Sequence, residues 1–172
     1  MTVAVNILLF QAGWFACVLG AAHAMPWLGP LGAAAVFAWH LARSAQPVQE
    51  PALVAVAAVL GALFETLLVQ TGWVRFETGV LIEGTAPYWM VALWAIFATT
   101  LNVSLRWLRA RTGLAALFGA IGGPAAYYAG AKLGALELVR TGAALAAIAA
   151  GWAILTPVLL RAARRLDGYA RP

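Results

Sequence analysis

Long apolar runs separated by short polar segments recur along the whole chain. Each run has about the 20 residues with which an α-helix crosses a hydrocarbon core roughly 30 Å thick. Within hydrocarbon, a helix satisfies its own backbone hydrogen bonds. The pattern therefore predicts six helices, over residues 3–22, 27–43, 52–71, 88–108, 112–133 and 141–162.

The connections between the predicted helices differ in length. The segment 44–51 contains Pro47 and Pro51, which we expect to keep it outside a helix. The longest connection, 72–87, mixes apolar and charged residues and leaves three interpretations open. The three interpretations are a short hairpin around Thr78 and Gly79, a lid that lies on the bundle, and the aromatic belt of a membrane interface.

The composition supports lipid as the solvent. Of the 172 residues, 64% are hydrophobic and 10% are charged. A water-soluble domain of this size needs more polar covering. We therefore predict an all-α fold, a polytopic membrane helix bundle, with residues 1–172 forming a single transmembrane domain. Residues 22–24 (AHA) resemble a signal-peptide cleavage site, but no Lys or Arg precedes them, so we expect the first helix to be retained.

The basic residues indicate an orientation. Eight arginines are expected at one side of the bundle and three basic residues at the other. The positive-inside rule then places both termini in the cytoplasm. A net charge of +5 is also compatible with nucleic-acid binding, but the clustering at helix ends favours a membrane, so no nucleic-acid partner is expected.

Glu65 is the most informative acid, because it lies inside the apolar run 52–71. The small residues Gly61 and Ala62 share its helix face, so Glu65 is expected to point into the bundle. An acid in a membrane costs about 2.5–3.5 kcal/mol on insertion scales, so it needs a partner or a proton. Trp14, Trp94 and Tyr127 are predicted at a similar depth, where the four residues would line an aromatic pocket for an amphipathic ligand. The alternative is structural: Glu65 hydrogen-bonds to Tyr127 or a backbone carbonyl.

Asn102 and Arg106 form a second candidate layer near the cytoplasmic end of the helix 88–108. Asn6 and His40 are expected at the same depth. One interpretation is a polar vestibule or headgroup site with Arg106 on a phosphate; the other is an ordinary interhelical hydrogen bond and an interfacial arginine. The chain has one cysteine and two histidines and lacks nucleotide-binding and metalloenzyme motifs, so no metal or cofactor is expected.

The helix 112–133 carries a stripe of small residues that favours close helix packing. Gly119, Gly123 and Gly130 lie on this stripe and are expected to contact another helix of the chain, or a second copy in a homo-oligomer. Pro124 and Pro157 are expected to bend their helices rather than to break them.

Two long blocks carry a family resemblance. Residues 86–108 (APYWMVALWAIFATTLNVSLRWL) and 119–136 (GAIGGPAAYYAGAKLGAL) resemble domain-of-unknown-function family 2878. The matching positions include Pro87, Trp89, Trp94, Asn102, Gly123, Pro124, Tyr127 and Gly130. The resemblance implies a small multi-pass protein of the bacterial inner (cytoplasmic) membrane, without an assigned activity, and favours a lipid-related role.

Three functions are compatible with these observations. The favoured one is a non-enzymatic accessory to lipid metabolism, which binds a lipid or hydrophobic small molecule in an intrabundle cavity lined by Glu65, Trp14, Trp94 and Tyr127. The second is a small proton-coupled transporter that uses Glu65. The third is a lipid-modifying enzyme, which has less support because no nucleophile or metal site accompanies the carboxylate.

Overall fold

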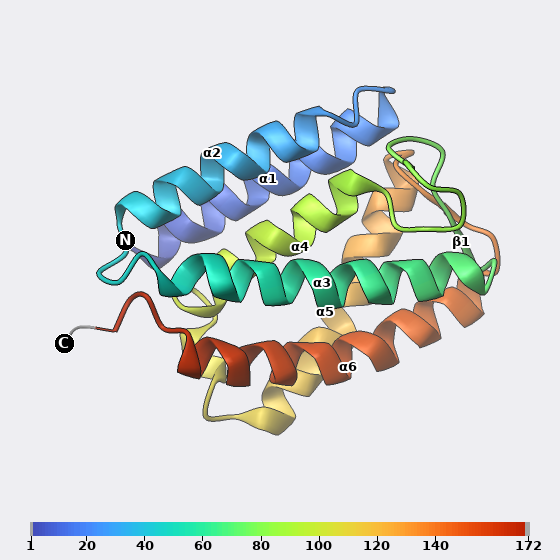
Figure 1. Cartoon of the computed structure of the whole chain (residues 1–172). Coiled ribbons are helices and arrows are strands. Elements are labelled where there is room, and N and C mark those ends of the chain that lie inside the picture. The colour runs from blue at the N-terminus through green and yellow to red at the C-terminus, as the bar shows by residue number, and fades with distance from the viewer. Residues whose placement is uncertain (1, 171–172) are drawn as a thin grey trace.

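Six α-helices form the bundle in the computed structural model, which describes residues 2–170 (Figure 1). They are α1 (Val3–Ala22), α2 (Leu28–Ala42), α3 (Gln49–Gln70), α4 (Tyr88–Leu101), α5 (Thr112–Lys132) and α6 (Thr141–Arg165). A 3-10 turn, η1 (Arg106–Leu108), and two short strands, β1 (Val74–Arg75) and β2 (Glu137–Leu138), complete the described secondary structure. The all-α prediction is confirmed. Neither Pro124 nor Pro157 ends its helix.

Four of these helices, α1, α3, α5 and α6, are long and apolar enough to cross a membrane. Helices α2 and α4 have only 15 and 14 residues. At 1.5 Å per residue, each of the two short helices is about 21–23 Å long, less than a hydrocarbon core of roughly 30 Å.

Helix α4 occupies the centre of the bundle and packs against α1, α2, α3 and α6 (Figure 1). Its Trp89, Trp94 and Ile96 are among the largest fully buried side chains of the protein. Helix α5 packs mainly on α6. The chain runs back and forth, so both termini lie at one end of the bundle, called here the terminal end, and β1 and β2 lie at the other, called the strand end (Figure 1).

The prediction that the fourth helix continues to Leu108 was wrong, because α4 ends at Leu101. Asn6 of α1 explains the early end. Its Nδ2 donates to the Thr99 carbonyl at 3.1 Å, and its Oδ1 accepts from the Ser104 backbone N–H at 3.2 Å. A side chain from another helix thus satisfies backbone groups at the point where the helix stops. Apolar periodicity continues past this point and does not reveal the stop.

Helix α3 begins at Gln49, three residues before the predicted start. Pro51 therefore lies in the first turn of the helix, where its missing N–H has no intrahelical acceptor to lose. The earlier start places Glu50 on the helix rather than in a polar connection, and its side chain is fully buried.

The connection 72–87 does not form a hairpin around Thr78 and Gly79. Instead β1 pairs antiparallel with β2, so that Val74 is opposite Leu138. Phe76 is buried, and the Thr78 carbonyl accepts a 3.0 Å hydrogen bond from Trp89 Nε1. The segment therefore covers the strand end of the bundle, as the lid interpretation expected.

Candidate functional site

A crevice of about 700 Å³ lies between α1 and α5. Helix α4 and Trp152 of α6 contribute to its walls. The lining residues are largely apolar, aromatic or small: Ile7, Phe10, Gln11, Trp14, Phe97, Thr100, Ser104, Leu105, Trp107, Phe118, Gly119, Gly122, Gly123, Ala126, Ala129 and Trp152. Because α5 packs mainly on α6, the space beside α1 is left unfilled by helix packing.

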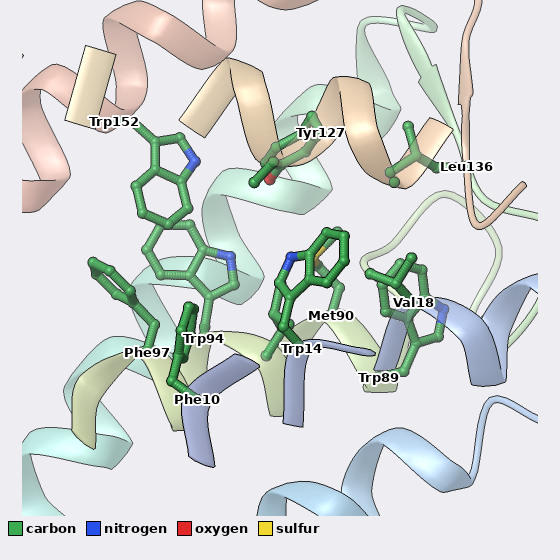
Figure 2. Close-up of a pocket in the computed structure, with 13 residues that line it drawn as sticks. Phe10, Trp14, Val18, Trp89, Met90, Trp94, Phe97, Tyr127, Leu136 and Trp152 are labelled. Atoms are coloured by element: carbon green, nitrogen blue, oxygen red, sulfur yellow. The ribbon is translucent and has the colours of Figure 1, made fainter. Parts of the chain in front are cut away.

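A smaller cavity of about 50 Å³ adjoins the crevice and shares five of its residues, Phe10, Trp14, Phe97, Ala126 and Trp152. It reaches toward the strand end, where Val18, Trp89 and Leu136 line it. Figure 2 shows aromatic side chains from α1, α4, α5 and α6 converging on this space. The two cavities therefore adjoin along a shared, mainly aromatic wall.

Glycines on α5 position the Trp152 wall. A Cβ on Gly119 would lie 2.2 Å from the Trp152 carbonyl oxygen, and one on Gly123 would lie 2.5 Å from the Trp152 ring. The glycines therefore allow α6 to approach α5 closely. Trp152 then stacks on Trp94, with ring centroids 4.5 Å apart. This part of the predicted stripe packs within the chain, while an oligomer through Gly119, Gly123 and Gly130 stays a prediction.

Glu65 lies behind the cavity wall, and the prediction that it points into the bundle is confirmed by its full burial. Trp94 Nε1 donates to Glu65 Oε1 at 2.8 Å, and the Tyr127 hydroxyl donates to the same oxygen. Both donors line the small cavity, whereas Glu65 is not among the lining residues. The carboxyl thus fixes the orientation of two wall side chains from different helices.

The four predicted pocket residues therefore divide into two roles. Trp14, Trp94 and Tyr127 line the small cavity, and Trp14 also lines the crevice. Glu65 contacts Trp94 and Tyr127, as the structural interpretation expected for Tyr127. Its second oxygen, Oε2, has no hydrogen-bond partner among the described residues. Ligand binding by these residues stays a prediction.

Trp152 was not identified from the sequence. It lines both cavities, and its Nε1 is buried. In Figure 2 this nitrogen faces the side of the cavity where Tyr127 lies.

A second cluster of polar side chains lies at the terminal end, around the buried Glu50. Glu50 Oε2 is 2.6 Å from His40 Nε2. Glu50 Oε1 accepts hydrogen bonds from Asn102 Nδ2 at 2.7 Å and from the Gly168 backbone N–H at 2.8 Å. The carboxylate therefore joins α2, α3, the end of α4 and the segment after α6.

The segment 166–170, called here the C-terminal strap, is held by further contacts. Asp167 Oδ2 accepts from Arg109 at 2.8 Å and from Arg106 at 2.5 Å. The Tyr169 hydroxyl donates to the His40 carbonyl at 2.6 Å. Burial raises the pKa of the Tyr169 phenol above its ordinary value.

The predicted layer of Asn102, Arg106 and His40 does form, but it faces the C-terminal strap. Asn102 is buried, with its Nδ2 also donating to the Leu166 carbonyl and its Oδ1 accepting from Arg109. Arg106 pairs with Asp167 instead of facing an open vestibule. Among the described residues, no group of three His, Cys, Asp or Glu side chains is arranged to hold a metal ion.

Sequence reasoning missed Glu50, because a glutamate between two prolines resembles an exposed connection. The position of Pro51 was the available signal: a proline in a first helical turn is compatible with a helix that begins earlier. Asp167 and Tyr169 carried no local signal, since their partners are 58 and 129 residues away.

Comparison with known families assigns the chain to one of them. A family model described as "Protein of unknown function (DUF2878)" matches residues 3–158. The chain belongs to the DUF2878 family. The match to DUF2878 includes Glu50, Glu65 and every residue that lines the crevice, and it ends before the C-terminal strap. No curated protein and no solved structure matches the chain.

Proposed function

We propose that this protein binds a membrane lipid, or a hydrophobic small molecule of similar shape, in the crevice between α1 and α5. The observation that carries the proposal is an apolar, aromatic-walled space of about 700 Å³ in a bundle suited to a membrane. Sites for small molecules typically enclose about 300–1,000 Å³ and combine apolar walls with a few polar groups. Gln11, Thr100 and Ser104 are such polar groups in the lining of the crevice.

The membrane setting favours a lipid as the occupant. The bundle belongs in a multi-pass arrangement in the bacterial inner membrane, with both termini in the cytoplasm according to the distribution of arginines. Acyl chains surround such a bundle, and an apolar crevice beside α1 would take one up in preference to water.

A binding protein that assists lipid metabolism accounts for the site better than an enzyme or a transporter. The crevice is lined by no carboxylate, histidine or cysteine among the described residues. Glu65, on which the proton-coupled transporter depends, lies behind Trp94 and Tyr127 rather than in the cavity lining. The chemistry of the lining supports holding a ligand rather than converting it.

Filling the crevice tests the proposal. Gly122 lines the crevice, and a Cβ built there meets no atom within 4 Å, so Gly122→Leu adds volume to the space without displacing the helices. Gly113, on the same helix, is equally open but does not line the crevice, which makes Gly113→Leu the matched control.

The measurement is native mass spectrometry of the protein released from detergent. Wild type and Gly113→Leu are expected to retain a lipid-sized adduct that Gly122→Leu loses. Equal adduct abundance in all three proteins, with unchanged thermal stability, would overturn the proposal.

A further inference from the structure

Two of the three polar groups that line the crevice, Thr100 and Ser104, lie near the end of α4, at the terminal end, while Gln11 lies near the middle of α1. Leu105 and Trp107 of the following turn continue the lining. Toward the strand end, Val18, Trp89 and Leu136 make the adjoining cavity apolar. This distribution favours an amphipathic molecule in the crevice with its polar head at the terminal end.

Arg111 stands at this end of the crevice. Its guanidinium carbon lies 5.8 Å from the centre of the Trp107 ring, and that ring lines the crevice. The stacking holds the cation beside Trp107, although Arg111 itself is not among the lining residues. Arg111 forms no ion pair with any residue that the structure describes, so its charge is available to a ligand.

The neighbouring acids cannot neutralise it. Of the six acidic residues, Glu50 and Asp167 are the two at the terminal end. Glu50 is fully buried among His40, Asn102 and Gly168, and Asp167 is bound by Arg106 and Arg109. Arg43, Arg161, Arg164 and Arg165 add further positive charge. The terminal end therefore carries a net positive charge.

We infer that the occupant is a phospholipid with an anionic headgroup, whose phosphate pairs with Arg111 while an acyl chain enters the crevice past Trp107. This inference rests on the proposed function and adds the class of lipid. Arginine suits a phosphate because its planar fork donates two parallel hydrogen bonds. A headgroup that carries a cation beside its phosphate, such as phosphocholine, has no net charge, which offsets part of this attraction, and is bound less well.

Competition between two lipids with identical acyl chains tests the inference. Delipidated protein is titrated with phosphatidylglycerol or phosphatidylcholine, and bound lipid is counted by native mass spectrometry. Wild type is expected to prefer phosphatidylglycerol. Arg111→Gln is expected to lower that preference about fivefold, the effect typical of one basic residue near a membrane surface, while Arg111→Lys retains most of it.

Arg165→Gln is the matched control, because Arg165 is another exposed arginine of the terminal end and, unlike Arg111, has no cation–π contact with a residue of the crevice lining. The control is expected to keep the wild-type preference. An equal preference in wild type and Arg111→Gln, or an equal loss in Arg165→Gln, overturns the inference.

The Gly122→Leu variant separates this inference from the proposed function. If it abolishes binding of both lipids while Arg111→Gln leaves the ratio unchanged, the crevice binds lipid and the headgroup assignment fails. If Gly122→Leu leaves the binding of both lipids unchanged, both fail. A further outcome is that the wild type is a lipid-free dimer and that Gly122→Leu dissociates it. This result would identify a second copy of the chain as the occupant of the crevice and would also overturn the inference.

Discussion

Asn102 donates a 2.7 Å hydrogen bond to Glu50, joining the end of α4 to the first turn of α3 across 52 residues of sequence. Asn102 Nδ2 also donates to the Leu166 carbonyl, and Glu50 also accepts from the Gly168 N–H. The two side chains therefore fix the C-terminal strap against the bundle. No residue of the strap lines the crevice.

Removing the Glu50 carboxylate is expected to destabilise the bundle strongly. Glu50→Ala leaves the Gly168 N–H and His40 Nε2 without their partner in a buried site, at a cost of roughly 3–5 kcal/mol. Thermal unfolding in detergent, followed by circular dichroism, measures the loss. Val48→Ala is the control, because Val48 is 84% exposed and should change little. Equal melting temperatures for the two variants would contradict a stabilising role for Glu50.

Substitutions at Glu65 separate hydrogen bonding from charge. Glu65→Gln keeps an acceptor oxygen for Trp94 and Tyr127, so its stability should stay within about 1 kcal/mol of wild type. Glu65→Leu leaves both donors buried and unpaired, which costs about 1–3 kcal/mol for each. The measurement compares the melting temperatures of Glu65→Gln and Glu65→Leu with that of wild type. A Gln variant as unstable as the Leu variant would show that the acceptor oxygen is not what Trp94 and Tyr127 require.

The helices and part of the site were predictable because their signals are local. Runs of apolar residues have a length set by the membrane, and the small residues beside Glu65 indicate its inward face. Trp14, Trp94 and Tyr127 line one small cavity, and their similar depth follows from counting along each helix, while ligand binding there stays a prediction.

The terminal end was less predictable because its contacts are tertiary. The stop of α4 depends on Asn6, which lies 93 residues before Thr99. The burial of Glu50 depends on a helix that begins before Pro51 and on Gly168, 118 residues further along. Likewise, the crevice arises from how α5 packs on α6, which the pattern of either helix alone does not encode.

The C-terminal strap is expected to weaken at alkaline pH. Burial raises the pKa of Tyr169 in the folded protein, so its neutral form is favoured there. Below the ordinary tyrosine pKa of about 10, both folded and unfolded chains carry the neutral phenol. Above it the unfolded chain ionises first, and the stability that Tyr169 contributes falls as the pH rises further.

Tyr169→Phe tests this dependence. At pH 8 the variant should melt below wild type, since it lacks the hydrogen bond to the His40 carbonyl, which typically contributes about 1 kcal/mol. The difference in melting temperature between wild type and variant should narrow between about pH 10 and pH 11, because only wild type loses the stability that Tyr169 contributes. A gap that stays constant over this range would exclude titration of Tyr169 as the cause.

The turn between α1 and α2 contains a strained alanine. Ala24 has φ 58°, in the left-handed region where a Cβ costs roughly 1–2 kcal/mol. Glycine relieves that strain but adds entropy to the unfolded chain, so Ala24→Gly is expected to stabilise the protein by about 0.5–1 kcal/mol. Ala45→Gly, in another exposed connection without a positive φ, should give no increase in melting temperature. A decrease in both variants would contradict strain at Ala24.

Gly61 sets the distance between α3 and α4, and Gly61→Ala is expected to disturb the cavity wall. A Cβ at this position would lie 2.1 Å from Trp94 Cγ, so the Trp94 ring must move away from Glu65. Overpacking of this kind costs about 1–3 kcal/mol, which exceeds the gain of up to 1 kcal/mol from replacing a helical glycine by alanine. Gly142→Ala is the control. The space beside Gly142 is open, so this substitution stabilises the helix without overpacking. Gly61→Ala should therefore melt below wild type and Gly142→Ala slightly above it. A stabilised Gly61→Ala variant would show that Trp94 is free to move, and that the contact with Glu65 does not hold this wall of the cavity.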